Sequence, residues 1–170
     1  MLIDAVLACA AVGFLAVFWL TPIGVPTLTR IGGGRTSPDL RFGYGGEETY
    51  RLLDAYGAKG VAHWRRLLLI DMIFPAVYAA LFVVLAGQWA GWVGAGPVWR
   101  AVAVGCPLLA GASDYAENLL LLRVLGALPR RTPAAVAAAS LFTRAKFASC
   151  AMTLAVPLLH WGATRMGVPG

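Results

Sequence analysis

Four stretches of mostly apolar residues, each close to the length that crosses a lipid bilayer, dominate this 170-residue chain. A spanning helix needs about 20 such residues, and the stretches lie at 2–20, 64–86, 98–125 and 134–161. Only 13% of the residues are charged, about half the share in a soluble domain. This composition excludes an ordinary soluble domain, a disordered chain and a polar nucleic-acid module. We predict an all-α fold, an integral membrane four-helix bundle forming a single transmembrane domain over 1–170.

The connection at 21–63 is the only long segment outside the four stretches. Its glycine-rich tracts lack the Lys-Ser/Thr ending of a phosphate-binding loop, so we expect a flexible connection there. Residues 47–58 carry apolar side chains at helical spacing opposite charged ones, and Gly57 is a plausible stop. This pattern predicts a short interfacial helix at the cytoplasmic surface.

Basic residues outside the stretches are distributed very unevenly. By the positive-inside rule, the side that carries more Lys and Arg faces the cytoplasm. Two basic residues flank the opposite side, Arg100 and Arg165. Ten lie in the first and third connections: Arg30, Arg35, Arg41, Arg51, Lys59, Arg65, Arg66, Arg123, Arg130 and Arg131. We therefore predict a multi-pass protein of the bacterial inner membrane, the cell membrane, with both termini on the non-cytoplasmic side.

Five charged residues lie away from the ends of the last three apolar stretches, where each costs about 2.5–3.5 kcal/mol at a helix centre. They cannot all face lipid, so they must turn inward, pair or reach water. At about 1.5 Å per residue, their distances from the nearest basic anchors place them in one layer between the cytoplasmic interface and the bilayer centre. They are Asp71, Asp114, Glu117, Arg144 and Lys146.

The spacing within each stretch places these polar groups on single helix faces. Asp114, Glu117 and Asn118 stand at i, i+3 and i+4. Asp71 and Tyr78 are seven residues apart, and Ser140, Thr143 and Lys146 step by three along a further polar stripe. The sequence therefore predicts a polar interior shared by three helices.

The charges of this layer sum to −1, from three carboxylates against two cations. An unpaired negative charge in low dielectric is removed most easily by a proton. We expect Asp114 and Asp71 to pair with Lys146 and Arg144, with Arg144 equally able to reach the cytoplasmic interface. Glu117 is then the acid that we expect to hold a proton near neutral pH.

No other chemistry is indicated by the sequence. No His and carboxylate groups have metal-ligand spacing, so we expect no metal site. The three cysteines read as small buried apolar residues, and no nucleophile elbow or cofactor motif is present. We expect no cofactor.

Three motifs in order carry a resemblance to known proteins. Asp71-x-x-Phe74-Pro75-x-x-Tyr78, Asp114-x-x-Glu117-Asn118 and Thr143-x-x-Lys146 resemble those of small uncharacterised bacterial four-helix integral membrane proteins. This resemblance implies a fold and a motif set but no activity. The chain is more loosely similar, at the level of the fold, to membrane sterol isomerases and membrane terpene cyclases. That similarity implies a helical bundle with inward acids around a lipophilic substrate.

The leading hypothesis is a membrane-embedded enzyme of isomerase or cyclase type, which uses acid–base residues on a lipophilic, isoprenoid- or lipid-like (terpenoid) substrate. The expected partners are that substrate and the bilayer, and not nucleic acid. The catalytic candidates are Asp71, Glu117, Asp114, Lys146 and Tyr78, and the substrate-binding candidates are Asn118, Phe74, Tyr115, Thr143 and Ser140.

Two alternatives stay open at this point. The acids and Lys146 can form a relay in a proton-coupled transporter or channel subunit, which for so short a chain predicts a homo-oligomer. They can also serve as interhelical contacts in a structural membrane assembly subunit.

Overall fold

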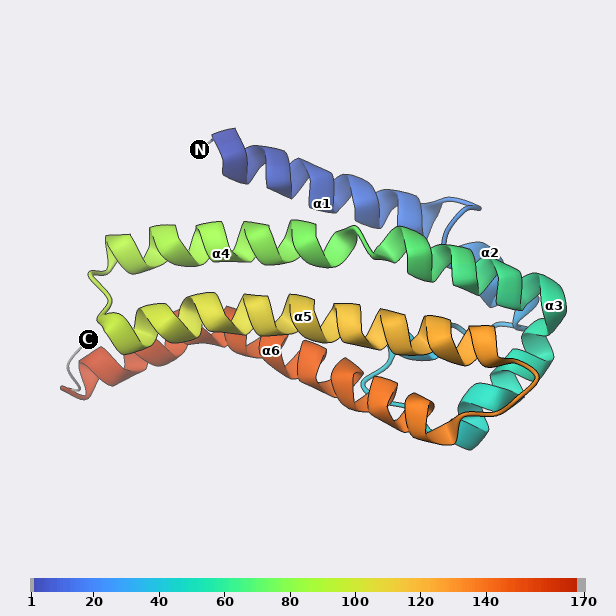
Figure 1. Cartoon of the computed structure of the whole chain (residues 1–170). Helices are drawn as coiled ribbons and strands as arrows, with labels where there is room; N and C mark the ends of the chain where they lie inside the picture. The colour runs from blue at the N-terminus through green and yellow to red at the C-terminus, as the bar shows by residue number, and fades with distance from the viewer. Residues whose placement is uncertain (1, 168–170) are drawn as a thin grey trace.

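The computed structural model describes residues 2–167, and within that range the chain is an all-α bundle without strands (Figure 1). This confirms the predicted fold class. The elements, in order, are α1 (Leu2–Leu20), α2 (Val25–Ile31), the 3₁₀ helix η1 (Pro38–Leu40), α3 (Gly46–Asp71), α4 (Phe74–Trp92), α5 (Pro97–Ala127) and α6 (Pro133–Arg165).

The stretch at 64–86 is not one continuous helix. Its first part is the end of α3, and the chain turns at residues 72–73 before α4 begins. Pro75 lies in the first turn of α4, where its missing N–H is tolerated. The amide of Ile73 donates to the carbonyl of Ile70 at 3.2 Å, which closes α3 with a tighter turn. The break places Asp71 at the end of one helix and Phe74 at the start of the next.

Helix α3 bends a second time, at Gly57. This residue has φ 56° and ψ −172°, a left-handed backbone that glycine adopts without the steric cost of a Cβ atom. The turns before Gly57 correspond to the expected interfacial helix at 47–58, and the turns after it run on to Asp71.

Within residues 2–167, three segments are long and apolar enough to cross a membrane, judged by length and composition: Leu2–Ile31, Gly46–Trp92 and Pro133–Arg165. We expected four spans. Helix α5 covers the predicted stretch at 98–125 and is long enough to cross a membrane, but it is not one of these three segments. Arg100, Asp114, Glu117 and Arg123 are spread along it and lower its hydropathy. Its acids face inward, so α5 is the polar helix of the bundle.

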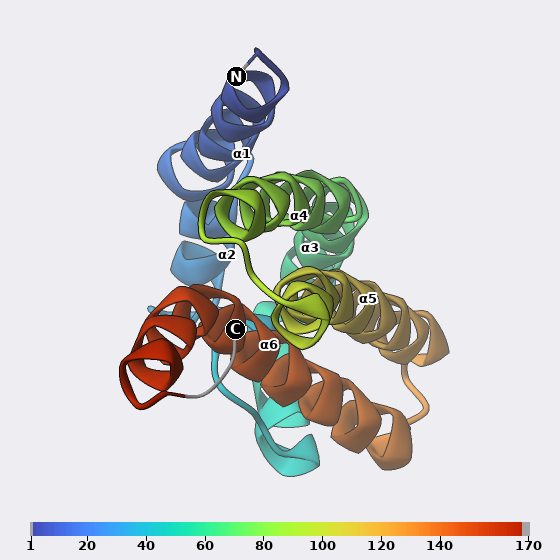
Figure 2. The same cartoon turned by 90° about the vertical axis from the view of Figure 1, so that its left-hand side faces the viewer.

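Helix α5 packs against both α4 and α6, and α1 packs against α4 from outside (Figure 2). The closest approach of α4 and α5 is at Gly111. A Cβ atom there would lie 3.1 Å from the Cβ of Ala79 and 3.3 Å from the carbonyl oxygen of Pro75. A small residue is therefore required at this crossing. Helix α1 is the least buried, with only Ala11 and Phe18 in the core.

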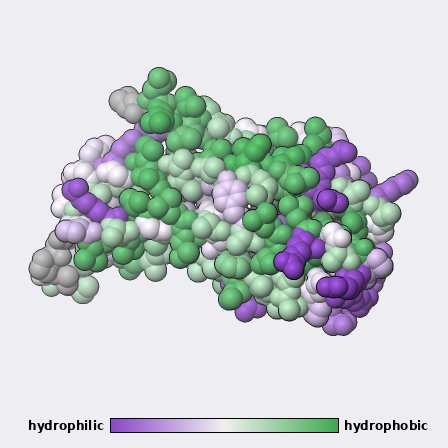
Figure 3. All heavy atoms as spheres, in the orientation of Figure 1, coloured by the Kyte–Doolittle hydropathy of each residue, from purple (hydrophilic) through white to green (hydrophobic). Residues whose placement is uncertain are grey.

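The surface divides into an apolar band and a hydrophilic end (Figure 3). The hydrophilic residues gather over α2, α3 and the loops beside them, while both termini lie at the opposite end (Figure 1). Large apolar side chains stand exposed along the band, among them Leu20, Val98 and Leu158 at 80%, 73% and 72%. Such a surface fits a protein embedded in a membrane.

Candidate functional site

Lys146 on α6 lies between two acids of α5. Its Nζ is 3.1 Å from Asp114 Oδ1 and 2.6 Å from Glu117 Oε2. The side chains of Asp114 and Glu117 are 6% and 0% exposed, so both ion pairs are shielded from water. The pairing of Asp114 with Lys146 is as expected from the sequence. The expectation that Glu117 lacks a cationic partner is wrong.

Both carboxylate oxygens of Glu117 have partners. Its Oε1 accepts hydrogen bonds from the hydroxyl of Thr143 and, at 3.3 Å, from the hydroxyl of Tyr44. Tyr44 is held in turn by its backbone amide, which donates to Ser140 Oγ at 2.9 Å. Burial raises the pKa of the Tyr44 phenol, and the negative charge of Glu117 raises it further. Tyr44 therefore stays protonated and acts as a donor.

Two further hydrogen bonds join the break between α3 and α4 to α5. Asn118 Nδ2 donates to Asp71 Oδ2 at 2.9 Å, and the hydroxyl of Tyr78 donates to Asp114 Oδ2 at 3.1 Å. Asp114 thus has a partner on each oxygen. Among residues 2–167, no Lys, Arg or His lies within ion-pair distance of Asp71. Asp71 is the acid of the predicted layer without a cation.

Arg144 does not take part in this cluster. It is exposed, and a Cβ atom at Gly43 would lie 2.6 Å from its Nε. The expected ion pair between Arg144 and Asp71 is therefore wrong. The exposure of Arg144 fits the alternative prediction, in which its side chain extends out of the polar layer toward the cytoplasmic interface.

A cavity of about 390 Å³ lies beside this cluster. This volume is within the range of small-molecule sites. Four charged side chains line it among many apolar ones, and the lining comes from α1, η1, α3, α4, α5 and α6. The lining residues are Ala11, Phe14, Leu15, Phe18, Trp19, Asp39, Leu40, Asp71, Phe74, Tyr78, Leu81, Phe82, Asp114, Lys146, Phe147 and Cys150.

The ten candidate residues fall into two groups around this cavity. Half of them line it, namely Asp71, Phe74, Tyr78, Asp114 and Lys146. The other five do not line it. Glu117, Asn118, Thr143 and Ser140 are buried. Glu117 and Asn118 bond to the lining residues Lys146 and Asp71, whereas Thr143 and Ser140 bond to Glu117 and Tyr44, which do not line the cavity.

Tyr115 is the fifth residue outside the lining, and our expectation that it walls the cavity is wrong. It is half-buried and follows Asp114 directly. Asp114 is the residue of α5 that lines the cavity.

Asp39 is the site residue that the sequence reasoning missed. It lies in η1, inside the segment we expected to be a flexible connection, yet it is 8% exposed and lines the cavity. That expectation is wrong for this part of the segment, because Ser37, Asp39 and Tyr44 are all buried. Its Oδ1 has no hydrogen-bond partner. Burial raises the pKa of the Asp39 carboxyl, and the charge of Lys146 lowers it only in part.

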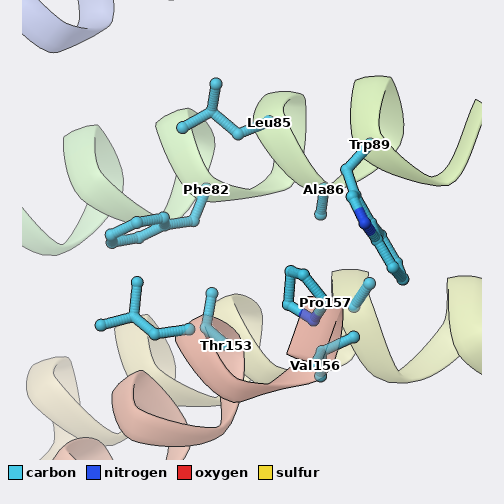
Figure 4. A pocket seen from close by; sticks show the side chains of 9 residues that line it. Phe82, Leu85, Ala86, Trp89, Thr153, Val156 and Pro157 are labelled. Atoms are coloured by element: carbon cyan, nitrogen blue, oxygen red, sulfur yellow. The ribbon is translucent and has the colours of Figure 1, made fainter. Parts of the chain in front are cut away.

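A second pocket of about 210 Å³ lies farther along α4 and α6, between Phe82 and Trp89 (Figure 4). No charged residue lines it, and Phe82 belongs to the lining of both pockets. In Figure 4 the side chains of Thr153, Val156 and Pro157 face it from α6. The two pockets therefore adjoin at Phe82, along α4.

Within the described part of the chain, no three His, Cys, Asp or Glu side chains are grouped so that they could hold a metal ion. No protein-family model, curated protein or solved structure matches the sequence or the fold.

Proposed function

We propose that this protein is a membrane-embedded enzyme that moves a proton on a lipophilic, isoprenoid- or lipid-like substrate, in a reaction of isomerase or cyclase type. One observation supports this more than any other. Asp71, Asp114 and Lys146 stand at one part of a cavity whose remaining walls are largely aromatic and aliphatic. Acid–base groups against an apolar cavity suit proton transfer to a carbon skeleton.

Asp71 is the proposed general acid. It lines the cavity and has no cationic partner among residues 2–167, so the protonated form is the one that its surroundings favour. Asp114 is the proposed base, and Lys146 and Tyr78 both donate to its carboxyl oxygens. In an isomerisation, Asp71 gives its proton to one alkene carbon, and Asp114 removes a proton from the carbon attached to the other alkene carbon. The double bond moves, and the proton count of substrate and protein is unchanged.

Glu117 has a different role in this proposal from the one we expected. It is fully buried and does not line the cavity, so it acts as a positioning residue for Lys146. Phe74 and Tyr78 belong to the wall of the cavity, and the rings of Phe14 and Phe74 stack with their centroids 4.7 Å apart.

We also propose a multi-pass placement in the cell membrane, with both termini on the non-cytoplasmic side. The distribution of ten basic residues against two supports this orientation. So does the position of both termini at the end opposite the hydrophilic surface (Figures 1 and 3).

The test is deuterium incorporation from heavy water. Protein in lipid nanodiscs is incubated with isoprenoid alkenes, and the products are analysed by mass spectrometry. We expect incorporation with the wild type and a loss of about 10²–10⁴-fold with Asp71→Asn, the usual share of general acid–base catalysis. Asp54→Asn is the matched control, because Asp54 is an acid in an exposed ion pair with Arg131.

Two outcomes would overturn the enzymatic proposal. One is an Asp71→Asn variant as active as the wild type. The other is proton flux through the wild type in liposomes that Asp71→Asn abolishes, without deuterium incorporation into any alkene. The latter result would favour the proton-coupled transporter or channel subunit.

A further inference from the structure

The charge of the cavity is not balanced by its own residues. Three carboxyl groups line it, those of Asp39, Asp71 and Asp114, against the single amine of Lys146. Lys146 is already shared between Asp114 and Glu117. Asp39 and Asp71 are therefore left without a cation of their own, in surroundings where an unpaired carboxylate is costly.

Asp39 adds a second, independent observation. The residue is more than nine-tenths buried, and its Oδ1 accepts no hydrogen bond. A buried acceptor without a donor costs about 1–3 kcal/mol. Since η1 brings this side chain to the cavity wall, a bound molecule with an N–H group can supply the missing donor.

The lining suits an organic cation better than a metal ion. No group of three potential metal ligands exists among the described residues. Aromatic side chains from α1, α4 and α6 surround the acids instead, including Phe14, Phe74 and Phe147. Aromatic faces attract ammonium groups as well as apolar chains. The second pocket, reached past Phe82, offers space for the tail of such a molecule.

We propose that this cavity binds a lipophilic amine in its protonated form, with the ammonium group donating to Asp39 and the apolar chain lying along α4 and α6 toward Trp89. The amine proposal names a class of ligand for the site of the proposed function. It rests on that function only in one respect, because it requires the cavity to admit lipophilic molecules. The N–H donor is the specific part of the proposal, because Asp39 needs a hydrogen bond as well as a charge.

The probe is radiolabelled decylamine, which is protonated at pH 7. Equilibrium dialysis measures its binding to the full chain in lipid nanodiscs, with empty nanodiscs subtracted. Unlabelled decylamine, decyltrimethylammonium and decanol then compete with it. We expect decylamine to compete at least about tenfold better than decyltrimethylammonium or decanol, because it alone can form a charge-assisted hydrogen bond with Asp39. Equal competition by decyltrimethylammonium or decanol in the wild type would overturn the proposal without any variant.

Asp39→Asn tests the residue itself. It should weaken decylamine binding at least about tenfold and leave decanol binding unchanged, while Asp54→Asn, which makes the same charge change at an exposed site, should leave both unchanged. Full decylamine affinity in folded Asp39→Asn would refute the assignment.

The two proposals fail in different ways. Amine binding that depends on Asp39, without deuterium incorporation into any alkene, would remove the enzymatic proposal and keep this site. Turnover that depends on Asp71, without preference for amines, would do the reverse.

Discussion

Replacement of Lys146 by Met tests the polar cluster most directly. The change keeps a long side chain and removes the only cation within ion-pair distance of Asp114 and Glu117 among residues 2–167. Two acids would then face each other with their side chains 6% and 0% exposed. Breaking a buried ion pair by removing one partner costs about 3–5 kcal/mol. Because this lysine has two such partners, we expect a loss in the upper part of that range.

The free energy of unfolding can be measured by titrating the protein in mixed micelles with a denaturing detergent, followed by far-ultraviolet circular dichroism. The double variant Lys146→Met/Glu117→Gln should recover at least about half of the loss, because it removes the more deeply buried of the two stranded charges. Asp54→Asn breaks an exposed ion pair with Arg131 and should cost less than about 1 kcal/mol. A Lys146→Met variant within about 1 kcal/mol of the wild type would show that the cluster does not depend on this cation.

Three further predictions concern the cavity and its helices. Asp39→Asn should be more stable than the wild type at pH 7. As the pH rises above 3.8, Asp39 ionises in the unfolded chain before it ionises in the folded chain, and this lowers the free energy of unfolding of the wild type. The difference should vanish toward pH 4 in the same unfolding titration, and a destabilised variant at pH 7 would contradict the raised pKa. Gly111→Leu should lower the free energy of unfolding by about 1–3 kcal/mol, because the larger side chain pushes α4 away from α5. Gly105→Leu is the control and should cost little, because no atom lies within 4 Å of an added Cβ there. Equal losses in the two variants would argue against the close crossing at Gly111. Phe82→Ala should join the two pockets and shift competition in the dialysis assay from decylamine toward hexadecylamine, and unchanged chain-length preference would place the tail elsewhere.

The bundle and the polar layer were predictable because both follow from simple periodicity. Charges in apolar stretches must turn inward, and helical spacing decided which of them share a face. Asp71, Asp114 and Lys146 accordingly do line one cavity. Tyr115 is different, because it does not line the cavity although it follows Asp114 directly. The pairing pattern was harder to predict, because sequence spacing within single helices does not determine which acids of α3 and α5 lie nearest to Lys146 on α6.

Asp39 could not be predicted, for a physical reason. Its position depends on the path of a loop, and no periodic pattern fixes that path. The signals available were the turn-forming Ser37-Pro38-Asp39 and the aromatic Tyr44, neither of which is specific. In the structure, the path is held by contacts distant in sequence, namely Tyr44 with Ser140 and Glu117.

The buried acids differ in how many of their carboxyl oxygens have hydrogen-bond partners, and this difference separates an acid that supports the structure from one that binds a ligand. Glu117, which does not line the cavity, has partners on both oxygens, and a fully satisfied buried network makes a structure rigid. Asp39 has a buried oxygen without a partner, at the wall of a cavity. A group of that kind destabilises the fold, so stability alone gives no reason for it. A bound molecule that donates a hydrogen bond to Asp39 provides such a reason, and the rigid Glu117 cluster keeps the cavity in place to receive that molecule.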